Sequence, residues 1–138
     1  MTTLCSVDDF GLILDFAFGM ADRGIPLTLV AIGPDRSVDA TTRMDLGSTL
    51  ARATRSTDRI VEVEEGVWIA LLVDCNRQGA LIYADRIGEG IAALGPVDCG
   101  IAAWSEAFDS ADDLLEAARA ALAVAREREG AHTEIHGE

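Results

Sequence analysis

Apolar residues recur along this chain with a period that changes several times, and each change predicts a new element. Spacing of three and four residues predicts amphipathic helices, at about 7–21, 41–55, 80–94 and 110–130. Short runs rich in branched apolar residues predict buried strands, at 27–32, 60–63, 67–73 and 97–103.

The order of these elements predicts the fold class. Glu64-Glu65-Gly66 is a tight connection between two strand runs, which makes them a β-hairpin. The order helix, strand, helix, strand, strand, helix, strand, helix contains the split βαββαβ arrangement of ferredoxin-like sheets, with an extra helix at each end. We therefore expect a single α+β domain over residues 1–130, followed by a polar C-terminal tail over residues 131–138.

Two histidines lie in the expected tail. His132 and His136 have helical i, i+4 spacing, with Glu134 between them, a pattern that fits either a metal site or a frayed polar tail. Their position next to the chain end and just past Gly130 favours the tail.

The charge of the chain argues against several kinds of partner. The sequence has 24 carboxylates and 11 cations, a net charge of −13, so nucleic acid and anionic membrane surfaces should repel it. All the cations are arginine, which removes Schiff-base chemistry and the P-loop lysine. Asp15 and Arg23 interrupt the apolar runs before a membrane span could form, and we expect a cytoplasmic protein.

The cysteines fit neither a zinc site nor a disulfide framework, and we expect reduced, mostly buried thiols at Cys5, Cys75 and Cys99.

Residues 55–72 carry a more specific pattern. Arg55 precedes Asp58 by three residues, five residues follow, and the hairpin turn then reads Glu64-Glu65-Gly66-Val67-Trp68 before an apolar strand. This stretch resembles, without a gap, the part of GGDEF domains (diguanylate cyclases) that reads R-x-x-D, five residues, G-G-D/E-E-F and a hydrophobic strand. Weaker matches cover nearly the whole chain, at Phe10, Leu14, 26–30, 98–102, 111–115, Ala118, Ala121 and Leu122. The resemblance implies a nucleotidyl cyclase fold of the GGDEF type and a role in bacterial cyclic di-GMP signalling.

Departures from the family pattern remove the metal ligands that the resemblance implies. Joining two GTP molecules requires divalent cations, which bind oxygen ligands. The family's metal-binding Asp falls on Gly33, and the two acidic signature positions fall on Gly66 and Val67, so none of the three can hold a metal ion. The nearby carboxylates are shifted from these positions along the chain: Asp35, Glu64 and Glu65. Because a misplacement of about 1 Å can already cost roughly 10²-fold in rate, they are poor substitutes for the family's ligands.

Substrate contacts are lost as well. Glutamates replace the two signature glycines that leave room for the nucleotide, and the chain between Gly33 and Arg55 is shorter than in the family by roughly three helical turns. The phosphate-binding Lys position is Arg126, where the helix dipole favours a cation, and the later Arg position is Gly130. We infer a catalytically inactive domain without metal or cofactor. An active diguanylate cyclase is the least favoured interpretation, and Mg²⁺-dependent GTP turnover would rescue it.

The R-x-x-D pair of the resemblance is retained. It implies a product-binding inhibitory site, in which the Arg55 fork would donate to the O6 and N7 edge of guanine and Asp58 would accept from N1 and N2. The chain could therefore be a receptor for cyclic di-GMP. Alternatively, Arg55 and Asp58 pair with each other or cap the turn into the next strand.

The first predicted helix has a second apolar stripe. Leu12 and Phe16 form an i, i+4 pair on the side opposite the main apolar face, and Met20 borders both sides. This stripe fits a surface for a partner protein or for a homodimer; it also fits a helix buried on two sides or scattered surface hydrophobes. Trp68 stands at the family's Phe position and is expected in the core. The leading hypothesis is an inactive regulatory domain that works through protein contacts, and cyclic di-GMP binding is the alternative.

Overall fold

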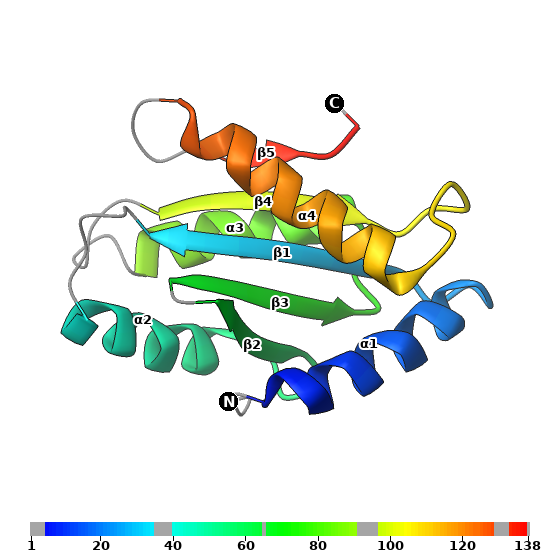
Figure 1. The fold of residues 1–138 in the computed structure, drawn as a ribbon, viewed down its shortest axis with the longest axis horizontal. Helices are drawn as coiled ribbons and strands as arrows, with labels where there is room; N and C mark the ends of the chain where they lie inside the picture. The colour runs from blue at the N-terminus through cyan, green and yellow to red at the C-terminus, as the bar shows by residue number, and fades with distance from the viewer. Residues whose placement is uncertain (1–4, 35–39, 65, 91–96, 129–132, 138) are drawn as a thin grey trace.

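Four helices and five strands make up the described part of the chain in a computed structural model of the protein, which describes residues 5–34, 40–64, 66–90, 97–128 and 133–137. Figure 1 shows them as α1 (Val7–Ala21), β1 (Leu27–Pro34), α2 (Ala40–Ala53), β2 (Arg59–Glu64), β3 (Val67–Val73), α3 (Arg77–Gly90), β4 (Val97–Ala103), α4 (Ala111–Arg126) and β5 (Thr133–Ile135).

The strands form one mixed sheet in the order β2-β3-β1-β4-β5. Strand β1 pairs antiparallel with both β3 and β4, and β2 and β3 form the predicted hairpin. The expected α+β class and the βαββαβ core, with the helix α1 before it and α4 after it, are confirmed.

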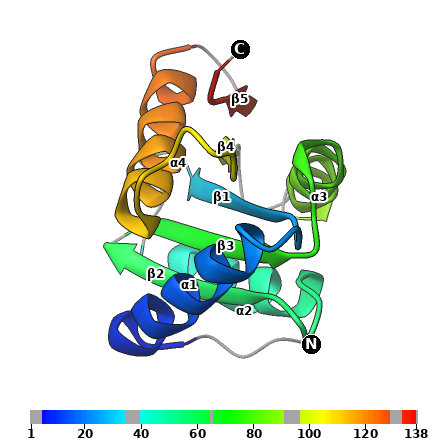
Figure 2. The same cartoon turned by 90° about the vertical axis from the view of Figure 1, so that its right-hand side faces the viewer.

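Helices cover both faces of the sheet, as Figure 2 shows. Successive side chains of a strand point to opposite faces, so Leu29 and Ala31 of β1 pack under α1 and α4, whereas Val30 and Ile32 pack under α2 and α3. A strand that is buried on both faces reads as a continuous apolar run, which is why short runs of branched apolar residues located β1 and β3.

The helix starts follow local capping chemistry. The Ser6 hydroxyl accepts a hydrogen bond from the Asp9 amide, and the Ser110 hydroxyl accepts one from the Asp113 amide. Helix α3 begins at Arg77, three residues before the expected start, because the Asn76 side chain accepts from the Gly79 amide at 2.9 Å and caps a polar first turn.

The C-terminal segment corrects one expectation. Thr133–Ile135 is not a tail but the edge strand β5, which pairs in parallel with β4. The His136 amide donates to the Ile101 carbonyl at 2.8 Å, and the His136 ring lies 5.5 Å from the Phe108 ring. Three residues are too short for a periodic signal, so only the open edge of β4 makes this segment a strand. Gly130 and His132 lie outside the described residues.

Candidate functional site

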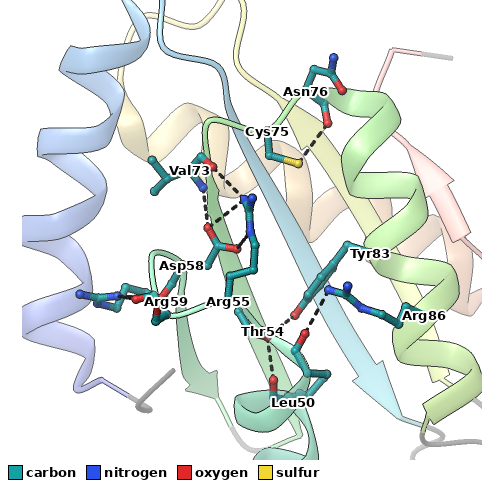
Figure 3. Close-up of polar contacts among 12 residues, drawn as sticks. Leu50, Thr54, Arg55, Asp58, Arg59, Val73, Cys75, Asn76, Tyr83 and Arg86 are labelled. Carbon is teal, nitrogen blue, oxygen red and sulfur yellow. Dashed lines mark hydrogen bonds and ion pairs between the residues drawn. The ribbon is translucent and has the colours of Figure 1, made fainter. Parts of the chain in front are cut away.

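Arg55 and Asp58 lie in the connection between α2 and β2, where they form an ion pair. Arg55 Nε is 3.1 Å from Asp58 Oδ2, and the Asp58 amide donates to the Arg55 carbonyl at 3.0 Å, which closes a turn. The pair also holds β3: the Val73 amide donates to Asp58 Oδ1 at 2.9 Å, and Arg55 donates to the Val73 carbonyl at 3.0 Å. The two side chains therefore do pair with each other, and together they join the turn to β3 (Figure 3).

The two side chains differ sharply in exposure. The Asp58 side chain is 2% exposed and the Arg55 side chain is 56% exposed. The hydrogen bond that Arg55 donates to the Asp58 carboxylate, followed by the negative charge of Asp58, raises the pKa of Arg55. In this geometry the carboxylate orients the guanidinium, and the guanidinium is the member of the pair that faces solvent.

A cavity of about 400 Å³ lies against this pair. Arg55 and Asp58 line one side, and α3 lines the other with Tyr83 and Arg86. Arg86 donates to the Ala53 carbonyl at 3.1 Å, and its Cζ lies 5.7 Å from the centroid of the Tyr83 ring. The cavity is thus lined by two guanidinium groups from different elements, together with the carboxylates of Asp58 and Asp74, and the guanidinium forks suit a ligand with planar, hydrogen-bonding edges.

Sequence reasoning missed Arg86. Its three-residue spacing from Tyr83 on a predicted helix places the two side chains on one face, and that signal was available. The sequence could not predict that this face lies close to Arg55, because that proximity depends on how α3 packs against the sheet. Burial raises the pKa of the Tyr83 hydroxyl, which hydrogen-bonds to the Thr54 hydroxyl at 2.8 Å.

The signature positions are tied to the domain's own residues. The Glu64 carboxylate accepts from Arg119 of α4 at 2.8 Å. Gly66 has a φ of 80°, Val67 is buried under α1 and α4, and Trp68 is buried on the α2 and α3 side, as expected for a core residue. Glu65 lies outside the described residues.

Arg126 occupies the space beside Gly33, near the end of β1. A Cβ at Gly33 would lie 2.7 Å from the Arg126 Cζ and 2.9 Å from its Nε, so only glycine fits there without moving the guanidinium. Within the described ranges, no group of three or more His, Cys, Asp or Glu side chains is placed to hold a metal ion. The described residues around this strand end therefore do not supply the carboxylates that the divalent cation implied by the resemblance would need. Asp35 lies outside the described residues.

The second stripe of α1 faces outward. Leu12 is 72% exposed and Phe16 is 71% exposed, so the alternative of a helix buried on two sides is wrong at these positions. Met20 is half-buried and, together with Phe16, lines a small apolar groove between α1 and the neighbouring strand ends.

Two further expectations concern cysteines and membranes. All three thiols are free: Cys99 is buried, where burial raises its pKa to about 12, and Cys5 and Cys75 are half-buried. Among the helices of the described ranges, none combines the length and the apolar character that a bilayer crossing requires.

Neither a protein-family model nor a curated protein matches the sequence. Solved structures do match. The active GGEEF domain of a Vibrio cholerae diguanylate cyclase has a TM-score of 0.88 at 16% identity, over 99% of both chains. The GGDEF domain of DgcB from Caulobacter crescentus, in complex with c-di-GMP, has a TM-score of 0.88 at 15% identity, over 99% of this chain and 94% of that one. Diguanylate cyclase SiaD from Pseudomonas aeruginosa, in complex with its activator SiaC, has a TM-score of 0.86 at 14% identity, over 96% of this chain and 58% of that one. The chain has the fold of a GGDEF domain.

Proposed function

We propose that this chain is a catalytically inactive signalling domain with the GGDEF fold, which works by binding and not by turnover. The observation that carries the proposal is the pair Gly33 and Arg126. A guanidinium fills the space beside the strand end where the resemblance requires a metal-binding carboxylate. The positive charge of Arg126 disfavours a divalent cation beside the strand end, because Gly33 offers no carboxylate to offset it.

Two features of the hairpin support the same conclusion. The first signature position is a glutamate whose carboxylate pairs with Arg119, so its charge is already engaged inside the domain. The third and fourth positions, Gly66 and Val67, offer no side-chain oxygen, and Val67 is buried. The described positions of the turn therefore offer a divalent cation no carboxylate that is not already paired.

The test is a GTP turnover assay with Mg²⁺ or Mn²⁺ and chromatographic detection of cyclic di-GMP. The Vibrio cholerae GGEEF domain serves as the positive control, because it is active and has the same fold. We expect no product above the enzyme-free background. Metal-dependent turnover that disappears in Glu64→Gln would refute the proposal.

The cavity favours a second candidate function, that of a receptor for cyclic di-GMP. Arg55 and Arg86 face a volume of about 400 Å³, which lies within the roughly 300–1,000 Å³ of ordinary ligand pockets. A guanidinium fork can donate to the O6 and N7 edge of guanine. Because the Asp58 side chain is 2% exposed, its role in this proposal is to position Arg55. The likeness to DgcB, which was solved with c-di-GMP, supports the same ligand class.

Calorimetric titration with cyclic di-GMP tests the receptor function. Arg55→Lys keeps the charge and loses the planar fork, and Arg86→Ala removes the guanidinium on the opposite wall. We expect micromolar or tighter binding that weakens at least about tenfold in both variants. Arg52→Ala is the matched control, since this exposed arginine lies on α2 outside the cavity. Absence of heat with a folded wild-type protein, or equal losses in the control, would refute the receptor function.

A further inference from the structure

The outer face of α1 carries the two most exposed large apolar side chains of the described residues, Leu12 and Phe16. They lie four residues apart and are therefore neighbours on the helix surface. The opposite face of the same helix is buried through Phe10, Leu14 and Ala17. Core packing thus accounts for one side of α1, and Leu12 and Phe16 leave the other side as a ridge of apolar surface in water.

An apolar groove runs beside this ridge. Its volume is about 160 Å³. Its walls are apolar side chains of α1, among them Phe16 and Met20, together with residues 25–27 and Val73 of β3. An apolar protein cavity of about 150 Å³ is large enough to bind benzene. The groove can therefore accept one aromatic ring or one branched apolar side chain from outside. An apolar ridge beside a groove of this size lets one large side chain of a binding partner fill the groove, and such buried anchor residues contribute most of the binding energy at interfaces.

The charges around the ridge determine which occupant fits. Leu12 has an aspartate at i−4, i−3 and i+3 on the helix: Asp8, Asp9 and Asp15, all exposed. No Lys or Arg occurs between Val7 and Ala21; Arg23, the nearest cation in sequence, lies beyond the C-cap. A second copy would bring the same acidic face against itself in a two-fold contact, which like charges disfavour.

We propose that the α1 ridge and groove bind a basic amphipathic helix of a different protein. This inference rests on the proposed function of a non-catalytic domain that works through binding. The helix inserts one large apolar side chain beside Phe16 and places Lys or Arg residues next to the aspartates around Leu12. Such helix-in-groove contacts use apolar anchors at i, i+3, i+4 and i+7, and the acidic rim adds selection by charge. The likeness to SiaD, solved with its activator protein, is compatible with a protein partner.

The experiment uses a defined probe, a Leu/Lys peptide of roughly 18 residues, which is long enough to form a helix. It has Leu at helical spacing and Lys elsewhere, and a second peptide replaces every Lys by Glu. Binding of a fluorescent label on the peptide is measured at low and high salt with the wild type and with the double variant Leu12→Ser/Phe16→Ser. The control double variant Ile82→Ser/Val124→Ser removes two exposed apolar side chains from α3 and α4.

We expect the Leu/Lys peptide to bind the wild type and the control equally, and to bind Leu12→Ser/Phe16→Ser at least about tenfold more weakly. Asp8→Asn/Asp15→Asn should reduce the affinity and its salt dependence. The inference is overturned if the Leu12 and Phe16 changes have no effect or if the Glu peptide binds equally well. It is also overturned if sedimentation shows a dimer that these changes dissociate, since the occupant would then be a second copy.

GTP turnover by the same wild-type sample separates this inference from the proposed function. The peptide measurement involves no nucleotide, so loss of peptide selectivity contradicts only the docking surface. Turnover contradicts only the absence of catalysis.

Discussion

Replacing Asp58 tests the internal network that orients Arg55. In Asp58→Ala the Val73 amide loses an acceptor in a half-buried position, which costs about 1–3 kcal/mol. The ion pair adds only about 0–1 kcal/mol, because the Arg55 side chain is 56% exposed and water screens it. Together the two contributions give a loss of about 1–4 kcal/mol in the free energy of unfolding, and their mid-values give about 2–3 kcal/mol.

Asp58→Asn separates the two contributions. The amide oxygen can still accept from the Val73 amide, whereas the negative charge beside Arg55 is gone. This variant should lose about 1 kcal/mol, mainly the charge-assisted part of the pairing. The comparison therefore assigns most of the Asp58→Ala loss to the bond with β3.

Urea unfolding, followed by the fluorescence of Trp68 and Trp104, measures these free energies. For a domain of this size, the Asp58→Ala loss corresponds to a drop of roughly 6–12 °C in Tm. Asp85→Ala is the control, since an exposed aspartate on α3 should change stability by less than about 0.5 kcal/mol. If Asp58→Ala unfolds at the same urea concentration as this control, Asp58 does not hold Arg55 and β3 together.

Three further outcomes are expected. Gly100→Ala should lower the free energy of unfolding by about 1–3 kcal/mol or more, because its Cβ would overlap the backbone of α4, and the urea midpoint measures this. Burial raises the pKa of Cys99 to about 12, so the folded state keeps a proton that the unfolded state releases above about pH 8.5. The free energy of unfolding should therefore fall as the pH rises from about 8.5 towards 12, and it should fall less steeply in Cys99→Ala. For the same reason a thiol reagent at neutral pH should modify the half-buried Cys75 before Cys99. Glu64→Gln should change the free energy of unfolding, measured by urea, by less than about 1 kcal/mol, because the Arg119 pair is exposed. A larger loss would mean that this pair holds the hairpin to α4.

Local chemistry explains why so much of the fold could be predicted. The apolar face of α1, the caps at Ser6 and Ser110 and the run of β3 depend on residues within a turn or a strand of one another. The short strand β5 depends on the free edge of β4, which lies far away in sequence, and its residues contain no period of their own. The predicted tail was wrong at these residues for that reason.

The candidate site divides in the same way. Arg55 and Asp58 are three residues apart, so their pairing is a local property that the sequence could indicate. The burial of Asp58 against β3 and the presence of Arg86 on the opposite wall of the cavity depend on packing between elements. The prediction that Asp58 would accept from a ligand overlooked this burial.

Residue identity and short spacing were enough to predict the four helices and the strands β1 to β4, the absence of a carboxylate at Gly33 and Val67, the Arg55–Asp58 pair and the acidic apolar stripe of α1. What fills the space beside Gly33 depends instead on packing between elements. The guanidinium of Arg126 reaches it from the end of α4, a contact that exists only once the helix is packed across the sheet. Long-range contacts of this kind follow from packing, which no local pattern encodes.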